Sequence, residues 1–295
     1  MKKYIIGLGC SWTAGEGGWT EEIFKQFPEG RVQVNLRGKD DSHLRPMEHE
    51  NSWVNVLCRD HFPDYTPMNL GVKGIGNTAA VDQLYFCDRV DFNNSTGIIV
   101  LFLSGFERWD MFNQQPISQK FENDGYSNGL YKHNKWRTLW PNIGTRSGDG
   151  QSFDWYATNI WSEEFVACKN ILSILRLQTF AKAHGYKVIL ANTFNVRQDG
   201  GVIKYFNQYA PGIVSKVDWS NYLHTSVDYE AFMELLVERD GKLPKQEWVG
   251  YYQFYKSLPW PSTYLTNCDG AHPTIMGYKV IASEMAKFIK YKGYA

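Results

Sequence analysis

Two short segments near the ends of the chain carry residue types that could do chemistry. The first, Gly9 to Gly15, reads Gly-Cys-Ser-Trp-Thr-Ala-Gly and follows an apolar run, so Ser11 falls where an expected strand ends. Open α/β sheets bind ligands at the carboxyl ends of their strands, and backbone N–H groups there can face a developing negative charge. Ser11 is therefore a candidate nucleophile. The same segment can also be only a helix-capping turn, with Ser11 or Thr13 as the N-cap.

The second segment, Asp269 to Pro273, reads Asp-Gly-Ala-His-Pro and precedes an apolar helical pattern. Proline suits the first position of a helix, which puts Asp269 and His272 on the turn before it. A carboxylate three residues away can reach the imidazole Nδ1–H and fix its tautomer, which leaves Nε2 able to take a proton from a serine. Alternatively, Asp269 only braces the turn and His272 only caps the helix.

Together the two segments resemble the motif blocks of the SGNH (GDSL-type) hydrolase superfamily, with a nucleophilic serine near the N-terminus and Asp-x-x-His near the C-terminus. The resemblance implies a catalytic triad of Ser11, His272 and Asp269, with the Ser11 N–H as one oxyanion donor. The segment 69–77 resembles the second block of the family, in which a glycine N–H is a further donor, and Gly74 is the matching position. That segment can also be a glycine-rich loop with no charge to stabilise.

Two positions depart from the family pattern. Cys10 replaces the Asp of the first block, and Phe106 stands where the third block usually has an Asn whose side chain donates to the oxyanion. Loss of one such donor can reduce turnover by about 10²–10³-fold. Asn77, or Arg108 as a cationic clamp, is the candidate for a replacement donor. Sequences with these changes resemble a divergent branch of the superfamily found in bacteria and their phages.

Hydrophobic patterning predicts the scaffold. Short β-branched runs alternate with helical patterns, which predicts βαβ units on a mostly parallel sheet. The expected strands are Lys3–Gly9, Tyr65–Leu70, Gly97–Leu103 and Tyr186–Asn192. The expected helices are Asn51–His61, Thr78–Val90, Ser162–Ala183 and Thr274–Lys290. We therefore expect a single α/β domain over residues 1–295, a three-layer sandwich around that sheet, and the family resemblance implies the flavodoxin-like version of it.

Two regions, at about 106–161 and 194–267, break the alternation, and we expect them to be insertions on the scaffold. They hold Trp109, Trp136, Trp140, Trp155 and Trp161 in the first region and Trp219, Trp248 and Trp260 in the second. Flat rings beside hydroxyl-rich loops can form a sugar-binding platform. Rings under long loops can also simply fill the core, and the sequence leaves both alternatives open.

Composition and charge exclude several classes of function. Lys plus Arg and Asp plus Glu each total 31 among 295 residues, so there is no overall basic field to bind nucleic acid or an anionic membrane. No apolar run approaches the ~18 residues of a transmembrane helix, and the run from Tyr4 to Leu8 is shorter than the ~7–15-residue core of a signal peptide. We therefore expect a soluble protein without a signal peptide, located in the cytoplasm or on a virion.

The pattern of potential ligand residues argues against a metal or a cofactor. The five cysteines are widely spread and lack a Cys-x-x-Cys pair, which favours a reducing compartment without disulfides or zinc. The histidines other than His272 have no metal-ligand spacing. Gly7-Leu8-Gly9 begins like a dinucleotide-binding fingerprint, but Trp12 occupies the position of its third glycine. We expect neither a metal nor a cofactor.

The expected function is that of a metal-independent serine ester hydrolase. Its expected substrate is a small acyl ester, with an O-acetyl group on a glycan as the specific hypothesis. The departures at Cys10 and Phe106 favour an alternative, a catalytically weak or inactive protein of the same fold. Such a protein would bind glycans or form a structural part of a phage or multi-subunit assembly. Neither hypothesis predicts an oligomeric state.

Overall fold

A five-stranded, all-parallel sheet is the centre of the fold. The computed structural model describes residues 1–20, 22–23, 44–106, 108–112, 136–139, 156, 158–193, 201–225, 230–240, 263–265 and 272–295. The strands, in spatial order, are β2 (Thr66–Asn69), β1 (Lys2–Leu8), β3 (Ser95–Leu103), β6 (Lys187–Asn192) and β7 (Tyr222–Leu223). A separate antiparallel pair consists of β4 (Trp109–Phe112) and β5 (Trp136–Leu139). The α/β class with a parallel central sheet is thus confirmed.

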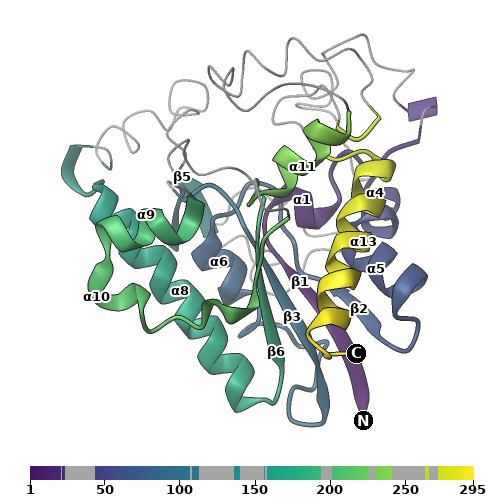
Figure 1. The fold of residues 1–295 in the computed structure, drawn as a ribbon, viewed down its shortest axis with the longest axis horizontal. Coiled ribbons are helices and arrows are strands. Elements are labelled where there is room, and N and C mark those ends of the chain that lie inside the picture. Colours follow the sequence, from purple (N-terminus) through teal and green to yellow (C-terminus); the bar gives the residue numbers. More distant parts are fainter. Residues whose placement is uncertain are drawn as a thin grey trace.

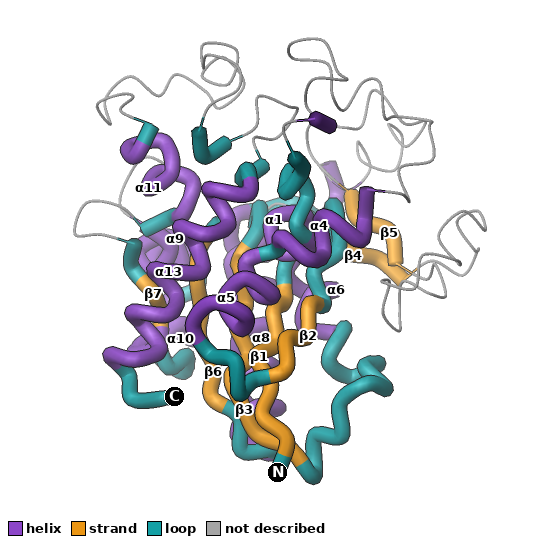
Figure 2. Tube along the Cα trace, turned by 90° about the vertical axis from the view of Figure 1, so that its right-hand side faces the viewer, coloured by secondary structure: helices purple, strands orange, loops and turns teal. Residues whose placement is uncertain are grey.

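Helices cover both faces of the sheet (Figure 1). One face carries α6 (Asn77–Asp82), α8 (Glu163–Ala183), α9 (Gly201–Tyr209) and α10 (Pro211–Val214). The other carries α5 (Trp53–His61), α11 (Phe232–Arg239) and α13 (Ile275–Tyr291), of which α5 and α13 lie in front of the sheet in Figure 2. The remaining short elements are α1 (Ser11–Ala14), α4 (Arg45–Asn51) and the 3₁₀ turn η4 (Trp219–Asn221). None of these helices is both long and apolar enough to cross a bilayer.

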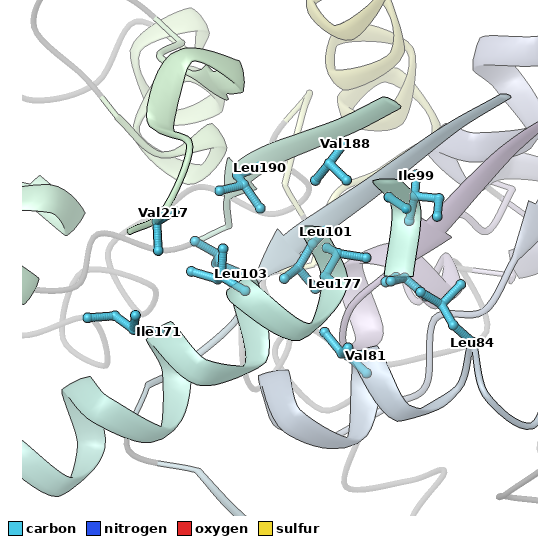
Figure 3. Packing of buried hydrophobic residues seen from close by; sticks show 14 of the residues in the cluster. Val81, Leu84, Ile99, Leu101, Leu103, Ile171, Leu177, Val188, Leu190 and Val217 are labelled. Atoms are coloured by element: carbon cyan, nitrogen blue, oxygen red, sulfur yellow. The ribbon is translucent and has the colours of Figure 1, made fainter. Parts of the chain in front are cut away.

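The central strand β3 supplies side chains to both layers. Because successive residues of a strand point to opposite faces, Ile99, Leu101 and Leu103 pack toward α6 and α8 (Figure 3), whereas alternate residues pack toward α5 and α13. A sheet buried on both faces requires such a continuous apolar run. On the second face, the ring of Phe102 stacks between Trp53 and Phe232, at centroid distances of 4.9 and 5.2 Å.

All but one of the expected strands and helices agree with the structure in their bounds. The four expected strands are present within two residues of their expected bounds. The helix expected over Thr78–Val90 ends as an α-helix at Asp82. From there the N–H groups of Leu84 and Tyr85 bond to carbonyls three residues back, which tightens the chain into turns.

The second region expected to be an insertion is partly scaffold. Residues 201–225 and 230–240 contain α9, α10, β7 and α11, which complete the sheet and both helical layers. β7 has only two residues, Tyr222 and Leu223, and it pairs with β6. A strand this short has no detectable hydrophobic period, which is why the pattern of the sequence missed it.

Phe102 tests this packing directly. Its side chain is fully buried between two aromatic rings, so Phe102→Ala removes contacts that small shifts cannot restore. We expect the free energy of unfolding, measured by urea denaturation, to fall by about 3–5 kcal/mol. The control is Tyr291→Ala, at a position that is 83% exposed, and its unfolding free energy should barely change. Equal losses in the two variants would contradict the packing described here.

Candidate functional site

Ser11 lies at the carboxyl edge of the sheet, where the strand order changes direction. β1 and β3 are neighbours, but β2 lies beyond β1 on one side and β6 lies beyond β3 on the other. In open α/β sheets this is the place where ligands bind. Ser11 is the first residue of α1, directly after β1 and at the opposite end of the sheet from the two chain termini (Figure 1).

Backbone contacts shape the turn that carries Ser11. The N–H groups of Thr13 and Ala14 both donate to the Cys10 carbonyl, at 2.9 and 3.0 Å. The Thr13 hydroxyl lies 3.4 Å from the Leu8 carbonyl, to which it donates. Cys10 is the N-cap of α1, and no side chain caps this helix. The alternative in which Ser11 or Thr13 serves as the N-cap is therefore wrong.

His272 comes from the other end of the sequence and precedes α13. Thr274 is the N-cap of that helix, and its hydroxyl accepts a bond from the Gly277 N–H at 3.2 Å. The Thr274 N–H donates to the Tyr264 carbonyl at 2.9 Å. Pro273 therefore lies before the helix and not at its first position. The N-cap is Thr274, so the alternative in which His272 caps the helix is wrong. These bonds fix the backbone beside His272, which is buried.

Ser11 and His272 meet although 261 positions separate them in the sequence. Ser11 Oγ lies 2.7 Å from His272 Nε2, a distance typical of a strong hydrogen bond. Burial lowers the pKa of the His272 imidazole from its usual value; the carboxylate of Glu16 opposes this shift, and the charges of Lys73 and Arg108 reinforce it. Neutral imidazole is therefore favoured at neutral pH, and in its Nδ1–H tautomer Nε2 accepts the hydroxyl proton.

The loop that carries Gly74 is tied to the turn of Ser11. The Val72 N–H donates to the Gly9 carbonyl at 3.0 Å, and Asn69 Nδ2 donates to the Thr13 carbonyl at 2.7 Å. Gly74 itself has a φ of 84°, a left-handed conformation that favours glycine. These bonds place the loop beside the turn that carries Ser11.

Asn77 has a structural role. Its amide donates to the Ser104 carbonyl at 3.3 Å and to Asn170 Oδ1 at 2.8 Å, and its own Oδ1 accepts from the Ser104 N–H at 2.8 Å. Both amide hydrogens are thus used in joining α6 to the end of β3 and to α8. This geometry corrects the expectation that Asn77 donates to an oxyanion.

Arg108 is half-buried and lies near the candidate site. Its Nη1 donates to the Ile75 carbonyl, in the loop of Gly74, at 2.9 Å. Its positive charge contributes to lowering the pKa of His272, which places the guanidinium within electrostatic range of the imidazole. Arg108 therefore stays a candidate for the replacement donor.

The two departures from the family pattern place apolar groups in the core. Phe106 is buried and stacks on Phe206, with a centroid distance of 5.0 Å. Cys10 is fully buried in the cluster on the opposite face of the sheet. Neither side chain supplies a polar group to the Ser11–His272 pair.

Asp110, which the sequence analysis missed, holds the loop between Gly74 and α6. Its two carboxylate oxygens accept bonds from the N–H groups of Gly76 and Ala79, at 2.8 and 3.0 Å. Gly76 is the N-cap of α6 and has no side chain to perform this function, so the carboxylate from β4 replaces it. An isolated Asp in an irregular region gives no sequence signal for such a long-range cap.

A charged group, of which Glu16 contacts the imidazole, was also missed. Glu16 Oε2 lies 3.3 Å from His272 Nε2. Lys73 Nζ lies 2.9 Å from Glu48 Oε1 and 3.8 Å from Glu16 Oε1, so it joins the two carboxylates. Trp19 Nε1 also donates to Glu48 Oε1, at 2.9 Å. Only the position of Glu16, soon after the candidate nucleophile, could have drawn attention to this group.

Some expected residues lie outside the described part of the chain. These are Asp269, Trp140, Trp155, Trp248 and Trp260. For Trp109 and Trp136 only the backbone is described. Trp219 is partly buried and packs against the edge of the core, with a centroid distance of 5.9 Å to Phe206 and a hydrogen bond to the Val214 carbonyl. Trp161 is partly exposed at 39%.

No match was found when the chain was compared with protein-family models, with curated proteins and with solved structures. Among the described residues, no group of three or more His, Cys, Asp and Glu side chains is arranged to hold a metal ion.

Replacing Asp110 tests how the Gly74 loop is held. In Asp110→Asn one of the two accepting oxygens becomes an NH₂ group that faces a backbone N–H, so a buried donor loses its partner. We expect the free energy of unfolding, measured by denaturant titration, to fall by about 1–3 kcal/mol. Asp91→Asn is the control, because Asp91 also accepts a backbone N–H but is exposed. A loss at Asp110 no larger than that at Asp91 would refute the capping role.

Proposed function

We propose that the chain is a serine ester hydrolase of the SGNH type that acts on a small acyl ester. The observation that carries this proposal is the 2.7 Å contact between Ser11 Oγ and His272 Nε2 at the carboxyl edge of a parallel sheet. A serine hydroxyl is a weak nucleophile until a base takes its proton. A buried imidazole whose neutral form is favoured is such a base.

The proposed reaction follows from the positions of these groups. His272 takes the proton of Ser11 as Oγ attacks the ester carbonyl. The N–H groups of Ser11 and Gly74 stabilise the oxyanion, and the guanidinium of Arg108 adds a positive charge. His272 then gives the proton to the leaving alcohol, and water hydrolyses the acyl-enzyme by the same steps. The family resemblance adds Asp269 as the residue that orients His272.

The proposed substrate is an acetyl or similarly small ester of a carbohydrate. Ser11 is 8% exposed and His272 is 5% exposed, which favours a small acyl group over a bulky one. The carbohydrate part of the proposal depends on the tryptophans in the regions 106–161 and 194–267. No metal or cofactor takes part in the proposed reaction.

Hydrolysis of p-nitrophenyl acetate by Ser11→Ala tests the proposal. We expect kcat/KM to fall by about four orders of magnitude, because the nucleophile is lost. Ser95→Ala is the matched control. Ser95 also has a buried hydroxyl, bonded to Tyr186, but it lies at the amino end of β3, at the other edge of the sheet. Equal rates for wild type and Ser11→Ala would overturn the proposal.

A fluorophosphonate probe with a mass-spectrometric readout separates an enzyme from an inactive protein of the same fold. We expect the probe to label Ser11 in the wild type and in Ser95→Ala, and labelling to be lost in His272→Ala because the base is missing. Absence of labelling in the folded wild type would contradict the proposed hydrolase and favour a protein that only binds its ligand.

A further inference from the structure

Glu16 lies beside His272 Nε2, the atom that transfers protons in the proposed reaction. Its Oε2 is 3.3 Å from His272 Nε2, the same nitrogen that Ser11 Oγ contacts at 2.7 Å. His272 Nε2 must also protonate the leaving alcohol, so the alcohol oxygen comes within about 3 Å of it. Groups one or two bonds from that oxygen are then within reach of the Glu16 carboxylate.

The backbone holds Glu16 firmly in this place. Gly15, the residue before it, has a φ of 99°, and a Cβ atom there would lie 1.9 Å from the Glu48 carbonyl oxygen. The Glu16 N–H donates to the Ser11 carbonyl at 3.1 Å, and the Glu16 carbonyl accepts from the Tyr278 hydroxyl at 2.8 Å. The backbone N–H and the backbone carbonyl of Glu16 are therefore both hydrogen-bonded to elements of the candidate site.

Lys73 forms ion pairs with Glu16 and with a second carboxylate, that of Glu48. Its Nζ lies closer to Glu48 than to Glu16, at 2.9 against 3.8 Å. The Glu16 side chain is 15% exposed and the Glu48 side chain 4%. Of the two carboxylates, Glu16 is thus the one that a bound ester can meet.

A carboxylate only accepts hydrogen bonds, so it recognises hydroxyl groups and repels anions. We propose that Glu16 sets the specificity for the leaving alcohol. Alcohols with a hydroxyl group next to the ester oxygen are accepted, as in an O-acetyl sugar, and alcohols with a carboxylate at that position are excluded. This inference rests on the ester hydrolase activity proposed above and adds a class of alcohol to it.

Two acetate esters with the same carbon skeleton test the inference. 1-Hydroxypropan-2-yl acetate has a CH₂OH group beside the ester oxygen, and 2-acetoxypropanoate has a carboxylate in its place. For the wild type we divide kcat/KM for the neutral ester by kcat/KM for the anionic ester. We expect this ratio to exceed the corresponding ratio of rates for base-catalysed hydrolysis in solution by at least about tenfold. In Glu16→Gln this preference should fall about tenfold, because an amide of the same shape does not repel the carboxylate.

A control variant, Glu284→Gln, and a reference ester, p-nitrophenyl acetate, make each outcome decisive. Glu284→Gln makes the same charge change on α13, where Glu284 pairs with Arg239 and Lys287, and it should keep the wild-type preference. Glu16→Asp, which draws the carboxylate back by one methylene, should give an intermediate preference and serves if Glu16→Gln does not fold. An unchanged preference in a Glu16 variant that still hydrolyses p-nitrophenyl acetate would overturn the inference alone. A wild type that does not hydrolyse p-nitrophenyl acetate would overturn the proposed function, and the inference with it.

Discussion

The hydrogen bond between Ser11 and His272 requires two distant parts of the chain to be held at one edge of a sheet. The N-terminal part supplies β1 and the turn after it, and the C-terminal part supplies α13, which packs on the same face as α5. Tyr278 joins them directly, because its buried hydroxyl donates to the Glu16 carbonyl at 2.8 Å. The chemistry proposed for the chain therefore depends on the packing of α13 against the first strand and its turn.

Buried carboxylates with specific partners support the site from both sides. Asp110 accepts two backbone N–H groups and so fixes the start of α6 next to the Gly74 loop. Glu48 binds Lys73 and the indole of Trp19, and it lies under the turn that positions Glu16. A buried charge without a partner is costly, so each of these carboxylates constrains the segments that supply its partners. Rigid placement of this kind is what the proposed nucleophile and its proposed base need.

The sequence predicts the elements that have a regular hydrophobic pattern and the residues that directly follow a strand. The apolar runs Tyr4–Leu8 and Ile98–Leu103 located β1 and β3, and the small residues after β1 located Ser11. Contacts between distant segments were not predictable, because nothing near Asp110 or Glu16 in the sequence marks the backbone groups and the imidazole that they meet. Asn77 was one of two candidates for a replacement donor because of its place in a motif, whereas its amide is used by Ser104 and Asn170. Such assignments fail because a motif does not show which partners a side chain has after folding.

A crystal structure of the protein after reaction with a small alkyl fluorophosphonate tests the central claim most directly. We predict a covalent bond from phosphorus to Ser11 Oγ, a phosphonyl oxygen about 2.7–3.1 Å from the N–H groups of Ser11 and Gly74, and His272 Nε2 on the side of the alkoxy group. An adduct on another side chain, or a phosphonyl oxygen that points away from Gly74, would contradict the claim that these residues form one hydrolytic site.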